Sequence, residues 1–298
     1  MKRFLVMLLA LSLILLPAWG LAEGKTIGYS TKTITNDAFQ LSLHDAIKAA
    51  VEANGDTFVS VLAESQTAVA TQVSQIEDLI NQDVDGLILN PMDSNACIQV
   101  LEKAKAAGIP VVLVDQGVEA GNEALYVTFI STDNFAGGKA AGERMAELIE
   151  TGNVIIVRGA NGSQAGDDRA DGFKAGIEGS GLTLINEQAG DWVVDKAMQV
   201  TENMIQANPD IQGIFCCSDN MLPGILQALG NNDLEGVTII SFDGSDAGIQ
   251  MVNDGAVAGT VAQFPDKIGA WGVEYLVKAM NGETGFDAFI DAGTQIIE

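Results

Sequence analysis

The chain contains the stretch Asp83-Val84-Asp85-Gly86-Leu87-Ile88-Leu89, and its second half contains a similar one, Asp210-Ile211-Gln212-Gly213-Ile214-Phe215-Cys216. Each is followed by a helical pattern and by a second apolar run that ends in an aspartate. In the first half this aspartate is Asp115, 29 residues after Gly86. In the second half it is Asp243, 30 residues after Gly213. Ligands of open α/β sheets bind at the edge formed by the carboxyl ends of the parallel strands. The repeat therefore predicts two similar halves whose aspartates face one cleft.

Short β-branched runs alternate with longer stretches of 3.6-residue periodicity along the rest of the chain, which indicates an α/β fold with parallel sheets. The predicted strands are Thr26–Ser30, Thr57–Leu62, Gly86–Asn90, Pro110–Val114, Tyr126–Ile130, Asn153–Arg158, Leu182–Asn186, Gly213–Cys217, Val237–Phe242 and Val257–Ala262. The predicted helices include Ala38–Ala53, Thr67–Asn81, Asn95–Ala107, Asn134–Glu150 and Asp195–Ala207. Asp37 and Ser94 are expected to cap two of these helices.

The composition excludes several classes of partner. The 298 residues include 15 Lys and Arg against 40 Asp and Glu, a formal charge of −25. A field of this sign repels nucleic acid and anionic membrane surfaces. With 47% hydrophobic residues, the chain has the composition of a globular protein.

The N-terminus has the pattern of a secretory signal. Lys2 and Arg3 precede the apolar run Phe4–Leu16. The segment that follows this run has small residues near its end, at Gly20 and Ala22. A retained anchor is the alternative, but the run has 13 residues, against roughly 20 for a membrane-spanning helix. We therefore expect cleavage before Glu23. No cysteine near this run could accept a lipid, so the mature protein is expected in the periplasm as a soluble monomer.

Cysteine and histidine are too sparse for most catalytic sites. Cys97, Cys216 and Cys217 do not form a disulfide framework and are expected in the core. The single His44 leaves no Ser-His-Asp or HExxH pattern, and the sequence has no GxSxG, no P-loop and no complete GxGxxG after a strand. We therefore expect no enzyme activity, no metal and no cofactor.

From about Lys25 to its end, the chain resembles the periplasmic sugar-binding proteins of ribose-binding type, which serve ABC importers. The resemblance rests on ordered segments, each weak alone. They are Asn36-Asp37-Ala38-Phe39-Gln40-Leu41-Ser42-Leu43, Asn90-Pro91-Met92-Asp93-Ser94, Gly108-Ile109-Pro110-Val111-Val112, Asp133-Asn134-Phe135-Ala136-Gly137-Gly138, Phe242-Asp243-Gly244 and Ala262-Gln263-Phe264-Pro265-Asp266.

The resemblance implies two Rossmann-like three-layer domains, the type I periplasmic binding protein fold, that close about a hinge over one sugar. The implied hinge crossings lie near Ser131-Thr132, Gln263-Phe264 and Ile290-Asp291. The implied lobes are 23–131 with 264–290 and 132–263 with 291–298, after a signal peptide at 1–22. The implied partner is an ABC permease. A chemotaxis or sensing receptor is the alternative role, whereas a sugar-responsive repressor would need a DNA-binding headpiece instead of an export signal.

The resemblance also implies the ligand contacts. Carboxylates and amides accept hydrogen bonds from sugar hydroxyls, and aromatic rings cover the C–H faces of a sugar. For Asp37 the alternative is a helix cap alone, and for Phe39 and Trp192 it is ordinary packing. The implied contacts are Thr33, Asp37, Phe39, Gln40, Asp115, Gln116, Asp167, Trp192, Ser218, Asp243 and Gln263.

The chain departs from the ribose-binding pattern at two arginines. Gln116 and Asp167 stand where that pattern has arginines, Arg169 is expected to face elsewhere on its helix, and Arg158 remains a possible substitute. Ribose itself is therefore not favoured. The predicted excess of carboxylates favours a neutral sugar, a polyol or an amino sugar over a sugar phosphate or uronic acid.

Overall fold

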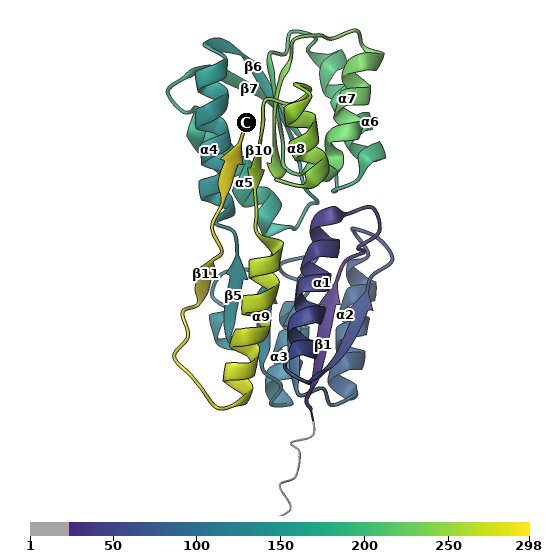
Figure 1. The fold of residues 1–298 in the computed structure, drawn as a ribbon. Helices are drawn as coiled ribbons and strands as arrows, with labels where there is room; N and C mark the ends of the chain where they lie inside the picture. The colour runs from purple at the N-terminus through teal and green to yellow at the C-terminus, as the bar shows by residue number, and fades with distance from the viewer. Residues whose placement is uncertain (1–23) are drawn as a thin grey trace, which may run out of the picture.

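The structure is a computed structural model that describes residues 24–298, so the predicted signal segment lies outside the described residues. It contains two six-stranded sheets, each covered by helices on both faces, in two lobes stacked end to end (Figure 1). This is the α/β architecture that the strand pattern predicts.

The N-terminal lobe has the strand order β11-β5-β4-β3-β1-β2, with every pair parallel. Its strands are β1 (Thr26–Thr31), β2 (Thr57–Leu62), β3 (Gly86–Leu89), β4 (Val111–Val114), β5 (Thr128–Ser131) and β11 (Phe289–Asp291). Its helices are α1 (Ala38–Ala53), α2 (Val69–Asn81), α3 (Ile98–Ala106) and α9 (Pro265–Met280), with a short 3₁₀ turn, η1 (Glu123–Leu125).

Strand β3 explains why this sheet has two covered faces. Successive side chains of a strand point to opposite faces. Ile88 packs in the cluster that includes Ile47 of α1, whereas Leu87 and Leu89 pack with Leu101 of α3. A strand that is apolar at every position must be buried on both sides, which is how the continuous apolar runs of the sequence predict a parallel sheet between helices.

The C-terminal lobe has the order β12-β10-β9-β8-β6-β7, parallel except for the last strand of the chain, β12. Its strands are β6 (Thr151–Arg158), β7 (Gly181–Ala189), β8 (Gly213–Cys216), β9 (Thr238–Asp243), β10 (Gly259–Ala262) and β12 (Gln295–Ile297). Its helices are α4 (Asn134–Leu148), α5 (Gln164–Ile177), α6 (Val194–Ala207), α7 (Leu222–Asn231) and α8 (Asp246–Asn253), with the 3₁₀ turn η2 (Asp219–Met221).

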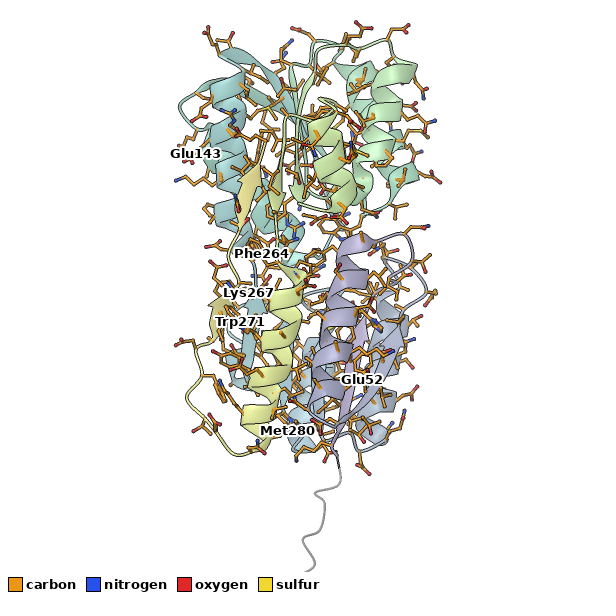
Figure 2. All side chains as sticks on the ribbon, viewed as in Figure 1. Glu52, Glu143, Phe264, Lys267, Trp271 and Met280 are labelled. Carbon is orange, nitrogen blue, oxygen red and sulfur yellow. The ribbon has the colours of Figure 1, made fainter. Side chains whose placement is uncertain are left out.

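The chain passes between the two sheets three times, after β5, after β10 and after β11 (Figure 1). The crossings are bonded to one another: Ala292 N donates to Ser131 O at 2.7 Å, and Thr294 Oγ1 donates to Ala262 O at 2.8 Å. Figure 2 shows Phe264, at the second crossing, where the lobes meet. Three adjacent strand-like crossings form a hinge.

One expectation about local structure is corrected. The third crossing follows Asp291 directly, next to the expected position, because β11 keeps Ile290 and Asp291 in the first sheet. Ser94 does not cap a helix: α3 begins at Ile98, and the Ser94 hydroxyl donates to Gly117 O. Asp37 does cap α1, accepting from Gln40 N at 3.0 Å.

The three cysteines are buried and none is in a disulfide, as expected of small core residues. Within residues 24–298, none of the helices is both long enough and apolar enough to cross a membrane.

Candidate ligand-binding site

One polar pocket lies between the lobes, at the carboxyl ends of strands from both sheets. It contains about 310 Å³ of space between protein atoms, part of which is open to solvent. Nine of the eleven residues implied by the resemblance line it, and Lys32, Ala165 and Arg169 line it as well. The nine are Asp37, Phe39, Gln40, Asp115, Gln116, Trp192, Ser218, Asp243 and Gln263.

The N-terminal lobe presents Asp115, which directly follows β4 with a left-handed backbone (φ 64°). Its Oδ2 accepts hydrogen bonds from Gln40 Nε2 at 2.8 Å and from Asn90 Nδ2 at 2.9 Å. Asn90 Nδ2 also donates to Gln40 Oε1 at 2.8 Å. These buried amides fix the carboxylate and leave Oδ1 without a partner among the described residues.

Asp37 has two roles, as a helix cap and as part of the pocket wall. Its Oδ1 accepts from Gln40 N, and its Oδ2 accepts from Gln66 Nε2 at 2.9 Å. Burial raises the pKa of Asp37, and the nearby Lys32 ammonium opposes that shift. The cap also sets the first turn of α1, which places Phe39 in the pocket.

The C-terminal lobe presents Asp243 at the end of β9. Its Oδ1 accepts from Gln263 Nε2 at 2.8 Å and from Arg169 Nη1 at 3.2 Å. Its Oδ2 accepts from Ser218 Oγ at 2.6 Å and from Asp219 N at 3.2 Å. Burial raises the pKa of Asp243 to about 7, although the Arg169 guanidinium acts in the opposite direction.

The expectation that Arg169 faces away from the pocket is wrong. Its side chain is buried, with Nε donating to Asn134 Oδ1 and Nη1 to Cys217 O, both at 2.8 Å. Helix α5 turns Ala165 and Arg169 toward the pocket, and residues four apart share one helix face. The pocket therefore keeps a cation from α5, at a different position from the one the family pattern implies.

Asp167 lies on the outer side of α5 instead. Its side chain is 48% exposed and forms an ion pair with Arg158. Arg158 Nη1 also lies 3.5 Å from Glu187 Oε1. Arg158 is therefore held outside the pocket and does not replace a family arginine. Thr33 is also absent from the pocket wall, and its hydroxyl accepts from Thr35 N at 3.1 Å.

Trp192 forms an aromatic wall at the C-terminal side of the pocket. It is 5% exposed and has a left-handed backbone (φ 63°), which is costly for a bulky residue. Gly159 makes room for the ring, because a Cβ there would collide with the indole. Lys32 Nζ lies 5.3 Å and Arg169 Cζ 5.7 Å from the ring centroid.

Helix α5 approaches α4 unusually closely, and this contact positions Arg169. A Cβ on Gly138 of α4 would collide with Arg169 O, and a Cβ on Gly172 of α5 would collide with Phe135 O. Glycines on both helices thus let the backbones touch. Asn134, at the start of α4, then reaches the Arg169 guanidinium.

Several polar atoms of the pocket residues have no hydrogen-bond partner within residues 24–298. The donors are Lys32 Nζ, Arg169 Nη2 and Gln116 Nε2; the acceptors are Asp115 Oδ1 and Gln263 Oε1. Buried polar groups are costly unless they are hydrogen-bonded. A ligand that fills this pocket must therefore offer both donors and acceptors, as hydroxyl groups do.

Fold and site together define a two-lobed binding protein with an interlobe pocket for a small polar molecule. Residues 27–284 match the family described as periplasmic binding protein domain, and the chain belongs to that family.

Named relatives bind sugars. Ribose import binding protein RbsB of Escherichia coli is 34% identical over 259 residues, covering 87% of this chain and 86% of that protein. The D-allose-binding periplasmic protein of the same organism is 31% identical over 256 residues, covering 83% and 82%. A solved ABC transporter periplasmic solute binding protein from Actinobacillus succinogenes, with bound D-allose, has a TM-score of 0.84 at 28% identity, covering 92% and 97%.

Proposed function

We propose that this protein captures a neutral monosaccharide or polyol between its lobes and delivers it to an ABC importer. The observation that carries the proposal is the set of unpartnered donors and acceptors in a small pocket that also contains Phe39 and Trp192. Hydroxyl groups suit such a set, and the two rings suit the C–H faces of a sugar. The family consists of binding proteins, and we propose the same non-catalytic role here.

The proposed contacts are the nine implied residues of the pocket wall together with Lys32 and Arg169. Asp115 is proposed to accept from a sugar hydroxyl through Oδ1, because amides already hold its Oδ2. Lys32 and Arg169 are proposed to donate to hydroxyl oxygens. Asp243, which already accepts four hydrogen bonds, is proposed to orient Arg169 and Gln263.

The charges of the pocket favour a neutral ligand over an amino sugar. An amino sugar would be favoured if the pocket held an excess of carboxylates with no cation among them. Instead, Asp37, Asp115 and Asp243 lie with Lys32 and Arg169, while Asp167 is outside. Lys32 Nζ also lies 5.3 Å from the centroid of the Trp192 ring, so this ring already has a cation beside it.

Export to the periplasm, cleavage before Glu23 and a monomeric state are proposed with this function. The signal-like N-terminal sequence and the D-allose-binding periplasmic relative support export and cleavage. Intact-mass measurement of the exported protein tests the cleavage site, since a mass that includes residues 1–22 or a lipid would contradict it.

Isothermal titration calorimetry against neutral, amino and acidic sugars tests the ligand class. We expect binding of at least one neutral pentose, hexose or polyol, and no binding of sugar phosphates. Binding of amino sugars alone would overturn the neutral-ligand proposal. Failure of all neutral sugars, with tight binding of a ligand that is not a carbohydrate, would overturn the function.

A further inference from the structure

The lobes also touch through side chains outside the hinge. Ser163 Oγ, in the C-terminal lobe, donates to Gln116 Oε1, in the N-terminal lobe, at 2.7 Å. Ser163 is fully buried and Gln116 is 2% exposed. Ser163 is not part of the pocket wall; it caps α5 by accepting from Gly166 N at 3.3 Å.

A backbone hydrogen bond lies beside this pair. Ser94 N, in the loop after β3, donates to Gly162 O at 3.0 Å. The Ser94 hydroxyl donates to Gly117 O at 3.2 Å, which ties the loops after β3 and β4 together. Gly162 has φ +83°, and a Cβ there would collide with the Asp93 carboxylate. A side chain at Gly162 would therefore have to displace the Asp93 carboxylate in the loop after β3.

We infer that these two hydrogen bonds, Ser163–Gln116 and Ser94–Gly162, form an interlobe latch that holds the closed form. The inference rests on the proposed function, since closure matters only if a ligand is captured between the lobes. Ser163 is then a positioning residue that raises affinity without touching the sugar. The mechanism is population shift: apparent affinity scales with the fraction of protein in the binding-competent state.

The latch gives a physical reason for glutamine at position 116. The ribose-binding pattern has an arginine here, and an arginine side chain carries donors but no acceptor. Gln116 accepts from Ser163 through Oε1 and keeps its Nε2 for the ligand. One side chain therefore serves both closure and binding.

Interlobe distances in sugar-free protein test the latch. Spin labels are attached at Glu64→Cys and Asp195→Cys, two exposed positions on different lobes, while the native cysteines are buried. The distance distribution is measured by pulsed electron resonance in this background and after adding Ser163→Ala, Ser163→Thr or Gln116→Met. Threonine keeps the hydroxyl for both the cap and the latch. Gln116→Met removes the acceptor and leaves the α5 cap intact.

We expect Ser163→Ala and Gln116→Met to reduce the short-distance population, and Ser163→Thr to restore it. For a sugar that binds, release from Ser163→Ala should be about fivefold faster, as expected for loss of one hydrogen bond. Identical distance distributions in the background protein, Ser163→Ala and Gln116→Met would overturn the latch. Because these distances need no ligand, failure of every sugar to bind would contradict the proposed function and not the latch.

Discussion

Lys32 is a buried cation whose ammonium group has no hydrogen-bond partner within residues 24–298, although it lies 5.3 Å from the Trp192 ring centroid. If it donates to a sugar oxygen, Lys32→Met should weaken binding of the neutral ligand by about 10- to 100-fold, the range for a charged hydrogen bond. Calorimetry measures the change. Lys48→Met, at an exposed position of α1, is the control and should bind normally. Unchanged affinity in Lys32→Met would remove Lys32 from the site.

Asp243 provides a prediction about pH and stability. Burial raises its pKa from 3.8 to about 7, so between these values the folded protein holds a proton that the unfolded chain has released. The contribution of Asp243 to stability is therefore largest at low pH and falls as the pH rises toward 7. Relative to Asp243→Asn, the wild-type protein should lose unfolding free energy over this range.

Urea unfolding at a series of pH values measures this difference. Asp287→Asn, at an exposed site, serves as the control for the same chemical substitution. A wild-type protein that gains stability relative to Asp243→Asn as the pH rises would contradict the assignment. Binding should follow the opposite trend, because a sugar site needs the ionised carboxylate to accept from Arg169 and Gln263.

The positions of the two aspartates could be predicted from the sequence, whereas those of the two pocket cations could not. Asp115 and Asp243 follow apolar strands, and a strand end has a defined place at the edge of a sheet. The predicted position of Arg169 is wrong because the resemblance implies that Asp167 faces the pocket. Instead Ala165 faces it, and Arg169, four residues further along α5, lies on the same face of the helix. Lys32 follows β1 without any pattern that distinguishes it from a surface lysine.

At the scale of elements, the contact between α4 and α5 connects packing to the site. Gly138→Ala adds a methyl group against the α5 backbone at Arg169. Overpacking of this kind typically costs about 1–3 kcal/mol of unfolding free energy. The variant should also bind sugar more weakly, because α5 carries Arg169 into the pocket.

Gly230→Ala is a matched control in α7, because nothing lies within 4 Å of the added Cβ. It should keep or slightly increase stability, since alanine favours a helix over glycine by roughly 0.5–1 kcal/mol. Urea unfolding and calorimetry of both variants provide the test. Equal stability and binding in Gly138→Ala and wild type would show that the close helix contact does not position α5.

The longer elements were predictable because burial determines their patterns. Helix α1 was predicted with the bounds Ala38–Ala53 that the structure has, since its apolar face repeats with helical periodicity after a capping aspartate. Strands β11 and β12 were missed. Each has three residues and no fully buried position, so neither produces an apolar run in the sequence.

For the whole molecule, the sequence repeat predicts two halves whose aspartates face one cleft, and Asp115 and Asp243 of the two sheets line one pocket. The contacts between the lobes could not be predicted in the same way. They depend on pairs such as Ser163 and Gln116, 47 residues apart, which meet only once both lobes are folded and closed. No local periodicity encodes such a pair.

Small-angle scattering tests whether the lobes close on a sugar. The radius of gyration is measured without ligand and at saturation with the neutral sugar that calorimetry identifies. Because closure brings the lobes together about the three-stranded hinge, the radius should decrease on saturation, and the decrease should be larger in Ser163→Ala, whose sugar-free form is more open. A radius that stays unchanged when a proven sugar saturates the protein would contradict the account.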